Sequence, residues 1–266
     1  MKLQPGVFCL VVIAISGCMW GKPGTTKSAI NTDTLAYKYT VFKQRAADCG
    51  EKADTACTVV KFKYPDFTGQ KKLNDTIVQK LINLFQLSEK PDTSLKELSK
   101  KFMASYLSAK KENSAEMFYS LDCYTKIIRQ DSSLTTLEIG GYSYMGGAHP
   151  ASFTGFVNWN TKADKIITLD DLIAPANKTK LAGIAEHIFR ASEKLADTAS
   201  LANNYFFKDN KFALNDNFSI TPTGLRFLYN QYEIKPYAAG TTELIIPYAK
   251  IKVLLLPNTI LTQYIK

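Results

Sequence analysis

The chain has 266 residues and a formal net charge of +9, with 45% hydrophobic and 21% charged residues. This balance is typical of a globular protein and excludes an intrinsically disordered chain. No apolar segment reaches the roughly 18 residues of a membrane-spanning helix. Two His and five Cys leave few ligands for a metal centre, so we expect neither a metal nor a cofactor. The basic residues are spread along the chain without a nucleic-acid-binding motif, so we expect no nucleic-acid partner.

The N-terminal segment predicts a location outside the cytoplasm. Lys2 precedes an apolar run, residues 7–16, which is too short to cross a membrane and is typical of a secretion signal. The sequence Ile-Ser-Gly-Cys, ending at Cys18, resembles the bacterial lipobox, whose cysteine is acylated. We therefore expect a lipoprotein signal peptide over 1–17, a lipid on Cys18 and a flexible tether over 18–34. Secretion without a lipid and an N-terminal core helix are the alternatives.

The residue after the cysteine bears on the destination. Met19 stands there, whereas Asp at this position favours retention in the inner membrane of Gram-negative bacteria. We therefore expect a lipid-anchored protein of the bacterial cell envelope, on the outer membrane if the cell is Gram-negative, facing the periplasm or the surface. Its membrane contact would be the N-terminal lipid.

Two strands begin the folded part of the chain. Tyr37, Tyr39 and Val41 alternate with polar residues, which predicts a half-buried strand. Residues 60–64 show the same alternation, and we expect Pro65 to end that second strand. The two strands would form a hairpin.

Two cysteines flank the polar, turn-like stretch between these strands. In an oxidising envelope we expect Cys49 and Cys57 to form a disulfide, which the chain-entropy relation values at about 2.6 kcal/mol for a loop this short. A metal-binding pair is the alternative, although no partners recur at ligand spacing. Cys123 is left over, either as a buried free thiol or as half of a disulfide to another chain.

Apolar spacing then changes from the period of a strand to that of a helix. Ser94 and Glu97 have the spacing of a capping box at the start of the second of two helices. The elements predicted here are, in chain order, helices over 71–87 and 94–111 and strands over 117–129 and 134–139. Together with the first hairpin they predict a small α+β domain over 35–140.

A second α+β domain is expected over 141–266, after a glycine-rich loop. Its predicted elements are strands over 153–159 and 166–169, a helix around 181–188, a hairpin over 218–229, a strand over 243–246 and a short apolar element over 248–256. Pro222 and Gly224 in the hairpin turn occupy positions that a type I turn prefers. The fold class is therefore α+β, with mostly antiparallel sheets.

Three stretches of this second half resemble a known family: residues 144–150, residues 217–225 and residues 232–240. Over about residues 35–258 the chain is similar to the extracellular domain pair of RsiV-type anti-sigma factors and to the non-catalytic part of some peptidoglycan deacetylases. Met145 and Ser219 depart from the family pattern, which has Thr and an aromatic residue there. The resemblance implies a small N-terminal domain and a C-terminal domain similar to part of an actin-like or Hsp70 ATPase subdomain. Family members with an assigned role sense lysozyme or accompany cell-wall enzymes.

The family-like stretches supply the candidate ligand-binding residues, which are Tyr144, Gly146, Gly147, His149, Tyr232, Glu233 and Tyr237. The glycines allow positive φ and close approach of the backbone. His149 can contact a ligand or can brace its own loop. The Tyr rings can stack on sugars, although aromatic residues in strands more often belong to the core.

Other residues that could suggest chemistry have simpler explanations. His187 lies off the apolar stripe of its helix, so we expect it at the surface. Asp170 and Asp171 suit the first turn of a helix, where carboxylates are stabilised. Ser143 and Ser152 flank the His149 loop without the context of a nucleophile elbow. The sequence therefore predicts no catalytic residue and no metal site.

The function expected is a lipid-anchored envelope module that recognises a lysozyme-like protein or a cell-wall glycan without catalysis. One alternative is a wall- or glycan-active hydrolase whose site includes His149 and Glu233. Another is a structural partner of an outer-membrane complex.

Overall fold

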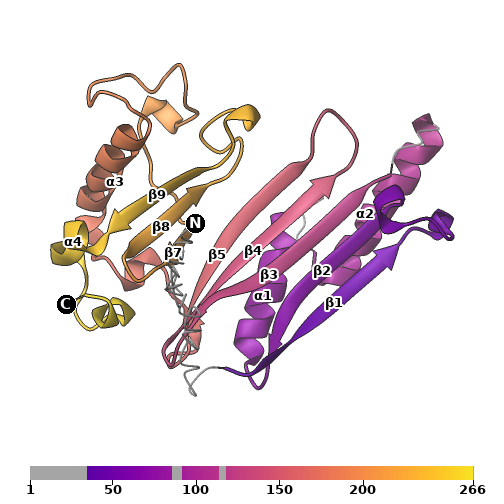
Figure 1. Ribbon diagram of the computed structural model, residues 1–266, viewed down its shortest axis with the longest axis horizontal. Helices are drawn as coiled ribbons and strands as arrows, with labels where there is room; N and C mark the ends of the chain where they lie inside the picture. Colours follow the sequence, from indigo (N-terminus) through magenta and orange to yellow (C-terminus); the bar gives the residue numbers. More distant parts are fainter. Residues whose placement is uncertain (1–34, 86–91, 114–117, 266) are drawn as a thin grey trace, which may run out of the picture. The chain divides into compact units, whose positions relative to one another are not determined.

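The computed structural model describes residues 35–85, 92–113 and 118–265. The predicted signal peptide, the tether and the lipidation site at Cys18 lie outside the described residues. Within them the chain is a mixed α+β protein with a six-stranded sheet and a three-stranded sheet (Figure 1). The fold class predicted from the sequence is confirmed.

The larger sheet has the strand order β1-β2-β3-β4-β5-β6. Its strands are β1 Tyr37–Arg45, β2 Val59–Phe67, β3 Ser120–Gln130, β4 Leu134–Tyr144, β5 Ala151–Asn160 and β6 Lys165–Ile166. Among these described strands only β2 and β3 pair in parallel, and the other neighbours are antiparallel. A parallel pair needs a long crossover, and here it contains α1 (Lys71–Leu84) and α2 (Leu95–Asn113).

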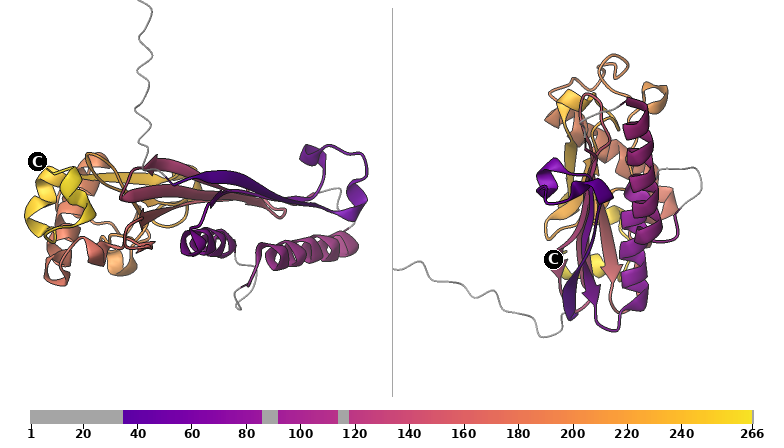
Figure 2. Two further views of the ribbon diagram at one scale, coloured as in Figure 1. Left: turned by 90° about the horizontal axis from the view of Figure 1, so that it is seen from below. Right: turned by 90° about the vertical axis from the view of Figure 1, so that its right-hand side faces the viewer.

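Both helices pack on one face of this sheet, as Figure 2 shows. The predicted stripe of α1 is buried at Leu73, Ile77 and Leu81. The predicted cap of α2 also forms, because the Glu97 backbone N–H donates to Ser94 Oγ at 3.1 Å. The Glu97 carboxylate accepts from the backbone N–H of Thr93, one residue earlier than a capping box requires.

The face of β1 that is buried is not the one predicted. Tyr37, Tyr39 and Val41, expected on the buried side, are 45%, 44% and 53% exposed. The helices cover the other side, where Phe42 lies beside the fully buried Phe62 with ring centroids 5.9 Å apart. Alternation showed that a strand is present, but it could not show which face the helices cover.

The prediction that Pro65 ends β2 is wrong, because Pro65 lies within the strand. It pairs with Tyr39, between positions that hydrogen-bond across the two strands, so its nitrogen points away from β1. Pairing of β2 with β3 runs only as far as Lys63 and Tyr124. Pro65 therefore occupies a position where no backbone donor is required, the condition under which a strand tolerates proline.

The smaller sheet is antiparallel and has the order β7-β8-β9. It contains β7 Phe218–Ile220, β8 Gly224–Tyr229 and β9 Thr242–Pro247, with α3 (Lys178–Ser192) against β9 and α4 (Tyr248–Ile251) after it. Phe189 of α3 is fully buried and touches the rings of Tyr205, Phe207 and Phe212, with centroids 5.1 to 5.6 Å apart. These four rings form part of the second core.

The domain boundary and one short strand near the middle of the chain differ in position from the prediction. The expected division at 140/141 falls inside β4, and the larger sheet continues through β5 to β6. The strand expected over 166–169 is limited to Lys165–Ile166. It stops because Thr168 and Asp171 form a capping box that starts a single 3-10 turn.

Asparagine side chains connect β5 to the smaller sheet. Asn230 accepts from the Thr154 backbone N–H at 2.8 Å, and Asn217 accepts from that of Phe156 at 3.1 Å. Both amides also donate to the Thr154 carbonyl. The outer edge of β5 at these positions is thus satisfied by side chains instead of a neighbouring strand.

A third asparagine makes the connection in the other direction. Asn158 of β5 is 2% exposed, donates to the Phe218 carbonyl at 2.9 Å and accepts from the Ile220 N–H at 2.8 Å. These two groups of β7 point away from β8, because Phe218 and Ile220 alternate with the positions that hydrogen-bond to it. Asn158 therefore satisfies backbone groups that no strand reaches.

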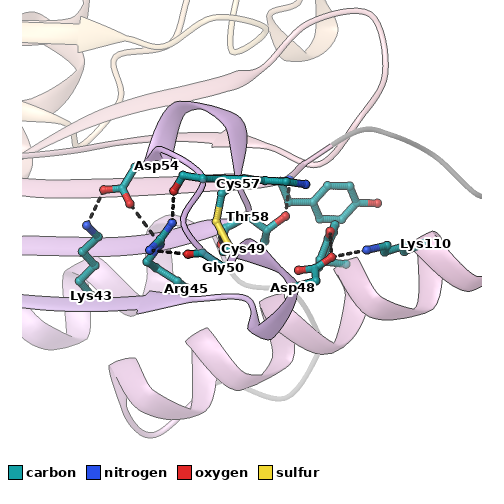
Figure 3. Close-up of a disulfide and its surroundings, with 12 residues drawn as sticks. Lys43, Arg45, Asp48, Cys49, Gly50, Asp54, Cys57, Thr58 and Lys110 are labelled. Atoms are coloured by element: carbon teal, nitrogen blue, oxygen red, sulfur yellow. Dashed lines mark hydrogen bonds and ion pairs between the residues drawn. A yellow bond between two sulfur atoms is a disulfide. The ribbon is translucent and has the colours of Figure 1, made fainter.

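The predicted disulfide between Cys49 and Cys57 is confirmed, with Cα atoms 5.4 Å apart (Figure 3). It joins the ends of two short 3-10 turns between β1 and β2. Asp54 in this loop pairs with Lys43 and Arg45, and Asp48 pairs with Lys110 of α2. These pairs hold the loop against β1 on one side and α2 on the other.

Cys123 is a free thiol and is completely buried. Burial raises its pKa, with a smaller contribution from Asp122. Its sulfur packs so closely on Gly141 that a Cβ there would lie 2.9 Å from it. A disulfide from Cys123 to another chain would require this part of the core to open.

Candidate functional site

The loop between β4 and β5 carries the first family-like stretch. Gly146 and Gly147 have φ values of 86° and 98°, which only glycine adopts without strain, as the sequence predicted. The Tyr144 hydroxyl donates to the Gly147 carbonyl at 3.2 Å and closes the loop. This loop presents His149, whose side chain is exposed.

The second half of the site is the turn after β8, which presents Tyr232. The Glu233 backbone N–H donates to the Asn230 carbonyl at 3.1 Å and closes this turn. Tyr232 has a φ of 66° and is 55% exposed. A left-handed conformation costs a non-glycine residue of the order of 1–2 kcal/mol. The surrounding bonds must therefore hold this ring in its outward position.

Glu233 is the residue that holds this turn. Its carboxylate accepts from the Asn230 backbone N–H at 2.7 Å and from the Asn215 amide at 2.6 Å. Ile234, the next residue, is buried in the second core and anchors the turn from below. Glu233 thus positions Tyr232 through the backbone.

The two loops meet through aromatic rings. His149 stacks on Tyr237 with centroids 4.0 Å apart and planes inclined by only 12°. The Tyr232 hydroxyl lies 3.1 Å from His149 Nε2, within hydrogen-bond distance. The structure therefore gathers His149, Tyr232 and Tyr237, which we call the aromatic cluster. His149 contacts both of these tyrosines and stays exposed at the same time.

The other predicted residues serve this cluster from a distance. Tyr144, Gly146 and Gly147 shape the β4–β5 loop, and Glu233 accepts hydrogen bonds from Asn230 in its own turn and from Asn215. Asn215 and Asn230, which the sequence analysis did not select, complete the turn. The sequence signal for these two residues is the tendency of asparagine to hydrogen-bond to nearby backbone. That tendency does not predict that both bond to Glu233.

The remaining polar candidates lie where the sequence predicted. The His187 side chain is 67% exposed and lies 3.6 Å from Asp197. Burial acts to raise the pKa of Asp171, but bonds from Lys165 and Thr168 outweigh it and keep that pKa below its usual value. Over the described ranges, no group of three or more His, Cys, Asp or Glu could hold a metal ion. In the same ranges no helix is long and apolar enough to cross a membrane.

Comparisons with known proteins cover both halves of the chain. A family model described as a protein of unknown function, DUF3298, matches residues 170–249. A model described as deacetylase PdaC matches residues 51–152. The two models match consecutive segments of the chain, the PdaC model first and the DUF3298 model second. No curated protein matches it.

Two solved structures share the fold. A DUF3298 family protein from Pseudomonas aeruginosa PAO1 superposes with a TM-score of 0.68 at 22% identity, covering 84% of this chain and 95% of that one. A DUF3298 family member from Bacteroides fragilis NCTC 9343 also gives 0.68, at 24% identity, covering 88% and 99%. The chain therefore has the fold of DUF3298 family proteins over most of its length.

Proposed function

We propose that this chain is a lipid-anchored protein of the bacterial cell envelope that binds a cell-wall glycan or a lysozyme-like protein through the aromatic cluster, without chemistry at that site. The envelope assignment rests on the apolar run before Cys18 and on the match to a model of deacetylase PdaC. It also rests on the disulfide, since such bonds persist in oxidising compartments.

The observation that carries the binding role is the conformation of Tyr232. A large ring that is 55% exposed and held at a φ of 66° is costly to maintain, and strain of this kind is concentrated at functional sites. The Tyr232 ring lies beside the stacked pair of His149 and Tyr237, with its centroid 5.9 Å from that of His149. Among the two ligand classes, this geometry favours a glycan, because a fixed aromatic face can stack on a sugar ring.

Two loops fixed by their own hydrogen bonds make such a cluster rigid before a ligand arrives. Rigid aromatic contacts lose little conformational entropy on binding, so a small site can still bind usefully. Glu233, the carboxylate that a hydrolase would need, instead accepts two hydrogen bonds within its turn. The geometry thus supports recognition more directly than catalysis.

Binding can be tested with chitotetraose, soluble disaccharide-peptide fragments of peptidoglycan and egg-white lysozyme, each titrated calorimetrically. Tyr232→Ala should weaken binding by about tenfold, the worth of one aromatic contact. Phe206→Ala is a matched control, because Phe206 is also 55% exposed. Failure of all three probes to bind, or equal losses in both variants, would contradict the proposal. A response to lysozyme alone would select the protein ligand.

The lipid anchor needs a separate test. Cells that express the full chain should accumulate its precursor when globomycin blocks removal of lipoprotein signals, and Cys18→Ser should abolish labelling by a fatty acid. A chain that matures normally under globomycin would remove the anchor while leaving the binding role open.

A further inference from the structure

A groove runs along the outer edge of β5, apart from the aromatic cluster. It consists of two adjoining cavities of about 490 and 300 Å³. Lys80 of α1, Phe156 of β5 and Asp216 from the segment before β7 line both cavities. The groove therefore has a wall from the first half of the chain, a wall from the second half and a strand as its floor.

The charged groups on these walls are available for a ligand. Lys80 and Asp216 are both exposed, and neither side chain makes an ion pair or a hydrogen bond within the described part of the chain. At the far end of the smaller cavity Lys178 and Asp170 pair with each other. The groove thus offers a cation and an anion whose charges are not already neutralised by a neighbour.

Three of the four amides that line the groove are not available in the same way, and the fourth, Asn83, accepts a hydrogen bond from Gln79. Asn217 and Asn230 line the larger cavity, but their side chains already bond to the backbone of Thr154 and Phe156. A site for a neutral sugar relies on such amides to bond to hydroxyl groups. Their commitment to β5 makes a sugar a poor fit here.

An apolar surface lies beside the charges. Phe153 lines the larger cavity, is 38% exposed, and meets Phe85 edge to face with centroids 5.5 Å apart. Gly155, on the same strand, leaves the floor open, since a Cβ there would find its nearest neighbour at 3.7 Å. A ligand that fits this floor is narrow and carries an apolar side chain.

We propose that this groove binds a short peptide in an extended conformation that carries both an ammonium and a carboxylate group. Its carboxylate pairs with Lys80, its ammonium with Asp216, and an apolar side chain rests on Phe153. No residue of the aromatic cluster lines the groove, so it adds a second ligand class to the proposed function.

The test uses the full chain purified with its disulfide intact. The probes are tetrapeptides of alanine with one phenylalanine at each position in turn, with free termini, with an acetylated N-terminus or with an amidated C-terminus. Binding is followed by NMR shifts of the amides of residues 80–84 and 153–158. Free peptides should bind saturably, and capping either terminus should weaken binding about fivefold, as expected for a partly exposed ion pair.

Variants assign each contact. Lys80→Gln should remove the effect of amidation, and Asp216→Asn should remove the effect of acetylation. Lys71→Gln is the matched control, since Lys71 is on the same helix but pairs with Asp75 outside the groove. Gly155→Leu should fill the floor and abolish binding. If that variant does not fold, the two charge variants, both at exposed positions, still decide.

Three results would overturn the proposal. They are the absence of saturable binding by any free tetrapeptide, equal affinity for free peptides and for peptides capped at either terminus, and displacement of the peptide by chitotetraose. None of these results depends on Tyr232, so the aromatic cluster can fail its own test while the groove passes this one.

Discussion

The two ends of the larger sheet are fastened in different ways. Beyond β1 and β2, a disulfide and exposed ion pairs hold the Cys49–Cys57 loop. Beyond β5, the buried amide of Asn158 and the half-buried amide of Asn217 attach the smaller sheet. From this comparison we expect that losing a buried amide hydrogen bond lowers the free energy of unfolding more than losing an exposed ion pair does. Exposed ion pairs are screened by water, whereas buried amides satisfy groups that have no other partner.

The largest effect should follow from breaking the buried junction. Asn158→Ala leaves the Phe218 carbonyl and the Ile220 N–H without their partner. The free energy of unfolding should therefore fall by about 3 kcal/mol. Urea unfolding measures this loss. Asn160→Ala is the control on the same strand, because Asn160 bonds only to an exposed turn. Equal losses in the two variants would show that the junction is not special.

Removing the disulfide should have the next largest effect. Cys49→Ser combined with Cys57→Ser should lower the free energy of unfolding by about 2.6 kcal/mol, because the unfolded chain regains the freedom of its loop. Buried Cys123 is unchanged in this variant and cannot account for the loss. Addition of a reductant to the wild-type chain should reproduce the effect. A loss greater than that of Asn158→Ala would reverse the comparison.

A third prediction concerns Asp131, which ties the C-terminal segment to the β3–β4 turn. Burial acts to raise its pKa, but bonds from the backbone N–H groups of Ser133 and Leu134 and from the Tyr264 hydroxyl outweigh it, so the pKa lies below its usual 3.8. A carboxylate whose pKa is lower in the folded state stabilises the fold when the pH is above its pKa in the unfolded chain. This stabilisation is lost as the pH falls through its pKa in the folded state.

Asp131→Asn should therefore cost about 1.5 kcal/mol at neutral pH, and the difference from wild type should shrink as the pH falls below 3.8. Melting curves from pH 7 to strongly acid pH measure it. Tyr264→Phe separates the hydroxyl contribution from the ring, which stacks on Tyr248. A pH-independent difference would mean that packing rather than charge is at work.

The smallest effect should come from the exposed ion pairs of the disulfide loop. Bonding to Lys43 lowers the pKa of Asp54, with a further contribution from Arg45. Both partners are well exposed, so Asp54→Asn should leave the melting temperature unchanged within error at physiological salt. A clear drop that disappears at high salt would show that this pair contributes more than its exposure suggests.

Much of the fold was predictable where one element carries its own signal. The cap at Ser94 and the apolar period of α1 define helices locally, and glycines at 146 and 147 indicate a loop with positive φ. Pro65 was misleading, because its effect depends on whether a neighbouring strand requires its N–H. The outward face of Tyr37 was equally hidden, because it depends on where α1 and α2 pack.

The candidate site divides in the same way. Residues such as His149 and Tyr237 could be selected from sequence, but only the folded chain brings them to 4.0 Å. The role of Glu233 changed from a candidate ligand contact to a support of its turn, because its partners come from Asn215 and Asn230. The groove along β5 had no sequence signal, since its walls lie more than a hundred residues apart in the chain.

By itself the amino-acid sequence determined the α+β class, the positions of the main helices and strands, and the pairing of Cys49 with Cys57. These features depend on neighbours close along the chain, whose periods, caps and turns act over a few residues. Tertiary structure alone decided which face of β1 is exposed, how the asparagines join the two sheets, and which rings form the aromatic cluster. Those outcomes depend on contacts between distant segments, which exist only when the core has packed.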